Sequence, residues 1–220
     1  MAKADFQFNF QFMKGSLTVV AFFVAGCLLG WISKTQQITI NDDISRYVLY
    51  FLMLQVGLSI GSDKNILKII NSVRPKLLLV PLATIIGTLV FSAIAALFIS
   101  KWNIFECLAI GSGFAYYSLS SILIMELKTA SLGVQLATEL GTIALMANIM
   151  REIMALLGAP LFVKYFGRFA PICAGGATTM DTTLPIITKY TGKDLVFLSI
   201  LHGILVDLCV PFFVSFFCSL

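Results

Sequence analysis

An acidic and a basic residue stand side by side within a long apolar segment, residues 135–163. If this segment crosses a membrane, a charge at its centre costs at least about 2.5–3.5 kcal/mol, so it should face a partner or a wet cavity. Glu152 follows Asn148 by one helical turn, which allows both side chains to contact one ligand, and Arg151 adjoins them. Such a carboxylate can bind a cation or carry a proton. The alternative is that Arg151 and Glu152 only satisfy other buried charges.

The same segment predicts a helix with one small and polar face. Small or polar residues recur at three- and four-residue spacing: Gly141, Ala144, Asn148, Arg151, Glu152, Ala155 and Ala159. Larger apolar residues fall on the other side: Met146, Ile149, Met150, Ile153 and Leu157. We expect the polar face to pack inward, because its small residues let another backbone approach closely.

Residues 172–189 form a second unusual segment, with the run G-G-A-T-T-M-D-T-T-L-P from Gly175 to Pro185. Glycine weakens a helix and proline removes a backbone donor, so this segment is predicted to be discontinuous near Gly175 to Asp181. Transporters use such breaks to aim half-helix ends at a substrate near the midplane. The candidate ligands here are Asp181, Thr178, Thr179 and Thr182. The alternative is that Asp181 or a threonine only caps a half helix.

Two further segments contribute candidates. Residues 104–125 carry small residues and hydroxyl groups between Gly111 and Ser121, including Tyr117 and Ser118, which suit either a cavity lining or close helix packing. The last segment holds His202 and Asp207 within its apolar run. We list His202 as a candidate for proton handling, with a satisfied structural histidine as the alternative.

The elements that position these residues are predicted to be transmembrane helices. Of 220 residues, 59% are apolar and 12% are charged, about half the charged share of a soluble domain. The apolar runs are long enough to cross about 30 Å of hydrocarbon. The expected spans are 15–33, 44–61, 76–99, 104–125, 135–163, 172–189 and 194–219. This predicts one all-α integral membrane domain of about seven transmembrane helices, with a change in the count if 172–189 is re-entrant.

Lysine and arginine residues in the connections predict the orientation. The densest cluster lies around 62–75, so we expect this loop, together with Lys3, Lys14, Lys128, Lys189 and Lys193, in the cytoplasm. The expected outer side carries Lys34, Arg46, Lys101, Lys164 and Arg168. The N-terminus is then cytoplasmic and the C-terminus periplasmic.

Other classes of function are disfavoured. The net charge of +4 is scattered between apolar runs, which indicates membrane topology rather than nucleic-acid binding. The five cysteines form no C-x-x-C pair, so we expect no metal site, disulfide or cofactor. They are Cys27, Cys107, Cys173, Cys209 and Cys218. An intramembrane peptidase would need a paired-aspartate motif such as G-x-G-D or a serine elbow with a histidine partner, and neither is present.

Four motifs in order resemble the bacterial lysine exporter family. They are G-F-A-Y-Y-S-L-S from Gly113, N-I-M-R-E from Asn148, G-A-T-T-M-D-T-T-L-P from Gly176, and His202-Gly203 followed by Pro211. The resemblance runs from about residue 44 to the end. It implies an inner-membrane carrier that expels L-lysine and toxic lysine analogues, with Glu152 and then Asp181 as the acidic residues that matter.

The wider fold resemblance is to cation–proton antiporters and bile-acid transporters. That group has two inverted repeats with crossing discontinuous helices, which implies a second repeat over 76–220 and the rest of a first repeat over 15–75. Family members usually have further spans ahead of the matched part. We therefore expect a separate small membrane subunit, or a homo-oligomer, to complete the transporter.

The resulting hypothesis is secondary active export of L-lysine, coupled to proton or cation entry. Glu152 and Asp181 contact the ammonium groups or exchange protons, and a half-helix N-terminus holds the carboxylate. The alternatives are a carrier for another amino acid or cation on the same fold, or a non-transporting accessory subunit.

Overall fold

The computed structural model describes residues 75–220 continuously and, ahead of them, only the helical positions 24–26, 28, 29, 32, 47, 51, 54 and 58. The predicted spans 15–33 and 44–61 and the basic 62–75 loop therefore lie almost wholly outside the described residues. The chain divides into two compact units, 1–41 and 42–220, and residues 75–220 belong to the second.

Residues 75–220 form helices joined by turns, as predicted for an all-α protein. The elements are η1 (Pro75–Leu78), α4 (Leu79–Ala96), α5 (Ile104–Gly111), α6 (Tyr117–Phe166), α7 (Ala170–Gly175), η2 (Gly176–Met180), α8 (Leu184–Thr191), η3 (Lys193–Leu195) and α9 (Val196–Cys218). Within this range three helices are long and apolar enough to cross a membrane: Leu79–Ala96, Tyr117–Phe166 and Lys193–Cys218. Five spans were expected here, and the difference lies in how two of them fold.

The long helix α6 consists of two arms, 117–132 and 134–166, separated at Gly133. Gly133 has φ +78°, a conformation that glycine adopts at little cost and other residues rarely adopt. The two arms run antiparallel and pack closely, since a Cβ added at Gly141 would lie 2.8 Å from the backbone oxygen of Ser121. The second arm is the predicted span 135–163.

The predicted continuous span 104–125 is wrong, because the helix breaks at residues 112–116. Phe114 and Ala115 both have positive φ, which ends α5 before α6 begins. The start of α5 is fixed by a capping box, in which the Asn103 side chain accepts from the Glu106 N–H and the Glu106 side chain accepts from the Asn103 N–H, both at 2.8 Å. We call residues 104–132 the first hairpin and residues 112–116 its tip.

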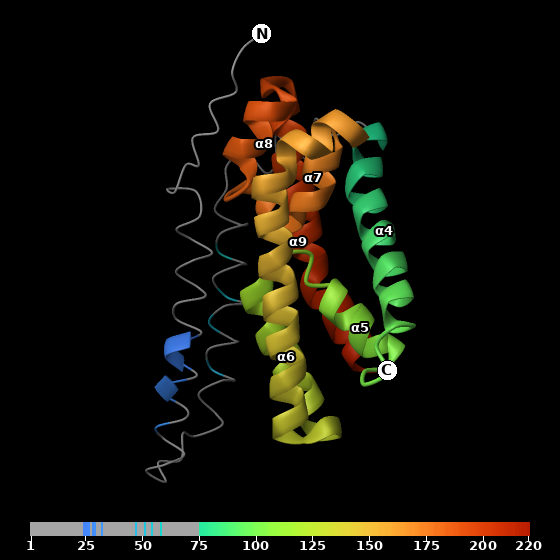
Figure 1. Ribbon diagram of the computed structural model, residues 1–220, viewed down its shortest axis with the longest axis vertical. Helices are drawn as coiled ribbons and strands as arrows, with labels where there is room; N and C mark the ends of the chain where they lie inside the picture. Colours follow the sequence, from blue (N-terminus) through green and yellow to red (C-terminus); the bar gives the residue numbers. More distant parts are fainter. Residues whose placement is uncertain are drawn as a thin grey trace. The chain divides into compact units, whose positions relative to one another are not determined.

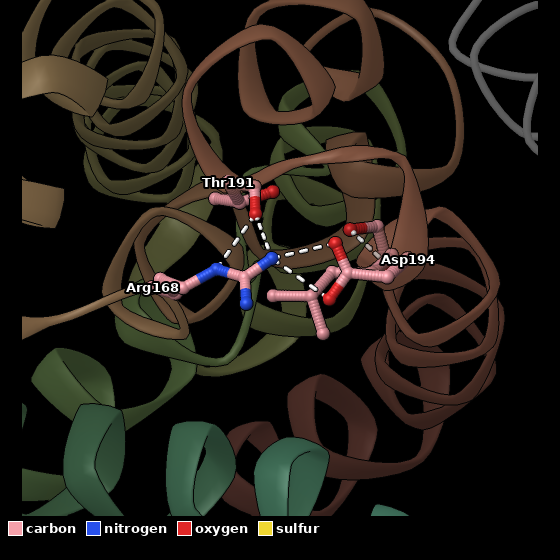
Figure 2. Close-up of polar contacts among 5 residues, drawn as sticks. Arg168, Thr191 and Asp194 are labelled. Atoms are coloured by element: carbon pink, nitrogen blue, oxygen red, sulfur yellow. Dashed lines mark hydrogen bonds and ion pairs between the residues drawn. The ribbon is translucent and has the colours of Figure 1, made fainter.

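The predicted break in 172–189 is confirmed. The α-helix stops at Gly175, a 3₁₀ turn follows from Gly176, and α8 begins only at Leu184. The two ends of this segment meet, because the Arg168 guanidinium donates to the Thr191 carbonyl and, at 2.6 and 2.8 Å, to both Asp194 carboxylate oxygens (Figure 2). Residues 170–191 therefore form a second hairpin, with residues 176–183 as its tip, rather than a crossing span.

The two hairpins enter from opposite ends of the bundle. Figure 1 shows α4, the second arm of α6 and α9 along the long axis, with α7 and α8 toward one end and α5 toward the other. A small apolar cluster of Ile172, Ile187 and Leu198 joins the second hairpin to α9. A larger cluster joins the first hairpin to the other half of α9 and contains Trp102, Phe114, Leu140, Val210 and Phe217 among others.

This topology corrects the expected sides of several cations. Lys164 and Arg168 were expected opposite Lys189 and Lys193, but the contact of Arg168 with Asp194 places all four at one end, here named the α8 end. Lys101 and Lys128 lie toward the other end, the Gly133 end, where Lys101 pairs with Glu139.

Candidate substrate site

The tips of the two hairpins touch each other. The Ala177 N–H donates to the Phe114 carbonyl at 2.9 Å, so each break satisfies part of the other's freed backbone. Gly176 makes this approach possible, since its φ is +60° and an added Cβ would lie 2.2 Å from the Phe114 oxygen. Two broken helices therefore meet in the interior of the bundle, the arrangement that lets backbone groups serve a ligand.

Asn148, from the second arm of α6, holds the first tip in place. Its Oδ1 accepts from the Ala115 N–H at 2.7 Å, and its Nδ2 donates to the carbonyls of Ile110 and Ala144 at 3.2 and 2.9 Å. Only 3% of Asn148 is exposed. Both amide protons are thus committed to the backbone, so the structure gives Asn148 a positioning role beside its predicted contact with a ligand.

Arg151 serves the second tip in a similar way. Its Nε and Nη2 each donate at 3.0 Å, to the carbonyls of Ala174 and Cys173 in the last turn of α7. Its Nη1 donates to Thr88 of α4 at 3.2 Å, and its guanidinium lies 5.9 Å from the centre of the Phe114 ring. A cation suits this position, because the C-terminal end of a helix carries partial negative charge.

Among the described residues the start of α6 lacks a side-chain cap, as does the start of the shorter helix α8. At the start of α6, the N–H groups of Tyr117, Ser118 and Leu119 make no hydrogen bond to another residue of 75–220. Tyr117 and Ser118 are half-buried. Free N–H groups at a helix N-terminus attract anions such as a carboxylate. The predicted residues Tyr117 and Ser118 thus lie in the first turn of a helix whose positive end is open.

The predicted carboxylates lie near this helix start. Glu152 is completely buried, on the inward face of the second arm, whereas Asp181 is exposed at the end of η2. Both carboxylates are close enough to the Tyr117 hydroxyl for their charges to interact with it. Asp181 Oδ1 accepts from the Thr182 N–H at 2.5 Å, and α8 has no side-chain cap, so Asp181 does not cap that helix.

The predicted inward face of the second arm is largely confirmed. Gly141, Ala144, Asn148, Glu152, Ala155 and Ala159 are buried, and Met150 and Leu157 are exposed. The predicted outward placement of Ile149 is wrong, because only 2% of this residue is exposed.

The threonines of the second tip divide into two kinds. Thr178 and Thr179 are buried and tie the tip to its surroundings, since Thr178 Oγ1 donates to the Gly175 carbonyl at 2.7 Å and Thr179 Oγ1 to the Ser199 carbonyl of α9 at 2.9 Å. Thr182 is half-buried beside Asp181. Thr178 and Thr179 shape the tip, and Thr182 is the threonine that flanks a carboxylate.

His202 is fully buried behind the second tip. Its Nε2 lies 2.9 Å from Thr84 Oγ1 of α4, and its Nδ1 lies 3.1 Å from Thr179 Oγ1. Since Thr84 Oγ1 also lies 3.0 Å from the Val80 carbonyl, the imidazole is a hydrogen-bonded link between α4, η2 and α9. This geometry favours the structural alternative for His202.

The structure adds two residues to the predicted set. Tyr116, at the end of the first tip, and Asp207, on α9, are close enough for their charges to interact with each other and with Asp181. Asp207 was noticed only as a titratable residue of an apolar segment. The signal that points to it is its spacing of one helical turn after Gly203, the α9 residue that touches the second tip.

Comparison with known proteins identifies the family of the chain. A family model described as lysine exporter LysO matches residues 20–218. A Haemophilus influenzae protein named "Putative lysine exporter" is 32% identical over 196 residues, which cover 89% of this chain and 94% of that protein. The Escherichia coli K12 protein named lysine exporter LysO is 31% identical over 175 residues, which cover 80% of this chain and 55% of that protein. No solved structure matches.

The family match covers most of the chain and includes both hairpins, the second arm of α6 and nearly all of α9. The chain belongs to the LysO family of lysine exporters.

Proposed function

We propose that this protein exports L-lysine by secondary active transport and binds it where the two hairpin tips meet. The observation that carries the proposal is the contact between the tips, which brings an uncapped helix N-terminus together with Glu152 and Asp181. Lysine carries one carboxylate and two ammonium groups, so its recognition needs both kinds of partner. The site offers both within one interior region.

In this proposal the substrate carboxylate accepts hydrogen bonds from the N–H groups at the start of α6. Glu152 and Asp181 contact the ammonium groups or exchange protons, with Thr182, Ser118 and Tyr117 beside them. Asn148, Arg151, Thr178, Thr179 and His202 hold the tips in position. Proton or cation entry drives export, because intramembrane carboxylates can bind such ions in alternation with the substrate.

The proposed location is the bacterial inner membrane, with the α8 end in the cytoplasm. Lys164, Arg168, Lys189 and Lys193 lie at that end, whereas Lys101 and Lys128 lie toward the other. Cytoplasmic connections carry the excess of lysine and arginine. The C-terminus, at the Gly133 end, is then periplasmic, and the N-terminus is proposed to be cytoplasmic. We retain one membrane domain, with 76–220 as a repeat and 15–75 as the remainder of another.

Lysine release tests the function. Cells without lysine exporters of their own are loaded with a lysine-containing dipeptide, and free lysine in the medium is measured with and without this protein. We expect faster release with the protein, and competition by other amino acids tests the alternative of a different substrate. If this protein, expressed together with a second membrane subunit, releases no more lysine than the empty vector, the proposal is wrong.

A further inference from the structure

We propose that Asp207 is a third acidic residue of the substrate site and binds the side-chain ammonium group of lysine. This inference rests on the proposed function and deepens it. Asp207 lies within α9, a helix long and apolar enough to cross a membrane, and it is only 4% exposed. None of the hydrogen bonds or ion pairs within residues 75–220 involves its carboxyl group.

The position of Asp207 along α9 matches the level at which the tips meet. One turn earlier, Gly203 packs against the second tip, where an added Cβ would lie 2.7 Å from the Met180 nitrogen and 2.9 Å from the Ala177 oxygen. Further along, the Phe213 ring packs edge-on against Phe114 of the first tip, with 6.1 Å between ring centres. Asp207 therefore lies between the two contacts, on the side of α9 that Gly203 presents to the second tip.

A structural role does not account for this carboxyl group. A buried carboxylate that serves the fold accepts hydrogen bonds, as Glu106 does from the Asn103 N–H. An unpaired carboxylate at membrane depth is costly unless a cation or a proton joins it. The one cationic side chain at the tips, within the described residues, is Arg151, and it is engaged by Ala174 and Cys173. No cation of the described residues therefore remains for Asp207, so its partner is a proton or a ligand cation, and in our proposal lysine supplies that cation.

The arrangement of the acidic residues separates the two ammonium groups of lysine. Glu152 lies one turn after Asn148, which holds the first tip ahead of the start of α6, where the substrate carboxylate binds in our proposal. Asp207 lies on α9, one turn after Gly203, which contacts the second tip. The α-ammonium group is adjacent to the carboxylate, and the side-chain ammonium is a full side-chain length away. Asp207, which lies on a different helix from Glu152 and near the other tip, is therefore assigned to the side-chain ammonium.

Binding of lysine and norleucine tests the assignment, because norleucine has a methyl group in place of the side-chain ammonium. The protein is purified in the assembly in which it is extracted from the membrane, and both ligands are titrated calorimetrically. We expect Asp207→Asn to weaken lysine binding about thirtyfold or more, as for loss of one partner of a buried charge pair, and to leave norleucine binding little changed. Asp207→Glu should restore part of the lysine affinity, and Glu139→Gln, an exposed acid on α6, serves as the matched control.

Unchanged lysine affinity in Asp207→Asn overturns the inference while leaving lysine export intact. An equal loss for both ligands also overturns it. If the wild type binds no lysine, the proposed function itself fails. Should Asp207→Asn not fold, the wild type is treated with the apolar carboxyl reagent dicyclohexylcarbodiimide and the labelled residue is identified by mass spectrometry. Protection of Asp207 by lysine, and not by norleucine, supports the inference, and absence of protection contradicts it.

Discussion

Glu152 is a fully buried carboxylate on the inward face of the second arm of α6, one turn from the residue that holds the first tip. Two neighbouring side chains hydrogen-bond to the backbone of the hairpins: Asn148 contacts the first hairpin and Arg151 contacts the second. A carboxylate is not needed for that task. At the scale of single residues, therefore, the proposed transport chemistry depends on Glu152, and the geometry of the tips depends on Asn148 and Arg151.

We predict that Glu152→Gln abolishes lysine export while the protein still inserts and folds. The amide keeps the shape of the side chain but cannot carry the negative charge that a cation or proton requires. Lysine release from dipeptide-loaded cells is measured at equal protein levels. Glu139→Gln on the same helix should export normally, because its pair with Lys101 is exposed and such pairs contribute little. Normal export by Glu152→Gln would remove Glu152 from the site.

We predict that Gly176→Ala destabilises the protein by about 1–3 kcal/mol, through a strained φ and overpacking against Phe114. The added methyl group would lie 2.2 Å from the Phe114 carbonyl and would displace the Ala177 hydrogen bond. Thermal unfolding in detergent should show a lower Tm. The control is Gly87→Ala in α4, where an added Cβ has nothing within 4 Å and alanine favours the helix. A Tm for Gly176→Ala equal to that of the wild type would mean that the tips do not meet as described.

At the scale of secondary-structure elements, residues 75–220 consist of two hairpins and three long helices. Each hairpin is a helix interrupted by residues with positive φ, Phe114 and Ala115 in the first and Gly176 in the second. The second arm of α6 supplies side chains to both tips, and α9 contacts both along its length.

We predict that the ends of the second hairpin depend more on Arg168 than on Asp194. Arg168→Ala removes the hydrogen bonds to the Thr191 carbonyl as well as the ion pair, whereas Asp194→Asn removes only an exposed charge. Exposed ion pairs contribute about 0–1 kcal/mol, so Asp194→Asn should leave the Tm nearly unchanged and Arg168→Ala should lower it. Equal effects of both substitutions on thermal unfolding would show that the ion pair, and not the carbonyl contact, closes the hairpin.

For the whole molecule, the hairpin topology determines which connections share a side of the membrane. Residues 170–191 return to the end at which they start, so Arg168 and Lys193 lie together. A crossing span would place them on opposite sides. If residues 170–191 form a hairpin, the lysine and arginine side chains of residues 75–220 are divided more unevenly between the two ends than if this segment crosses. The uneven division agrees better with the excess of positive charge on cytoplasmic connections.

We predict that single cysteines at positions 168 and 193 are labelled from the cytoplasmic side, and a cysteine at position 101 from the periplasmic side. A membrane-impermeant thiol reagent is applied to intact cells and to inverted vesicles of protein whose native cysteines are replaced by serine. Labelling of positions 168 and 193 from opposite sides would contradict the second hairpin. Labelling of both from the outside would reverse only the proposed orientation.

We predict that a separate small membrane subunit, or a second copy of this chain, completes the transporter. The exposed carboxylate of Asp181 supports this, because a carboxylate at membrane depth is costly unless a partner or a wet cavity covers it. Purified protein is reconstituted alone and with a co-expressed candidate subunit, and its mass in detergent is measured. Lysine export by a monomeric chain at the rate of the co-expressed pair would make this prediction wrong.

Several features followed from the sequence alone, because they depend on local composition and period. The membrane class follows from 59% apolar residues in long runs. The inward face of the second arm follows from helical spacing, and the break between Gly175 and Asp181 follows from the weak helix propensity of its residues. The family resemblance rested on the same local motifs and was confirmed by the family match.

Tertiary structure decided the rest, because it concerns contacts between residues far apart in the chain. The G-S-G run at Gly111 is compatible with either close packing or a break, and the hydrogen bonds from Asn148 and Ala177 stabilise the break. The sequence predicted that residues 172–189 cross the membrane, with a re-entrant segment as the alternative, and the Arg168 contacts hold the returning form. In the sequence Asp207 is an isolated acidic residue of an apolar segment. Only the packing of α9 against both tips places it beside them. Backbone groups freed at a break must find partners, and only the folded bundle determines which residues supply them.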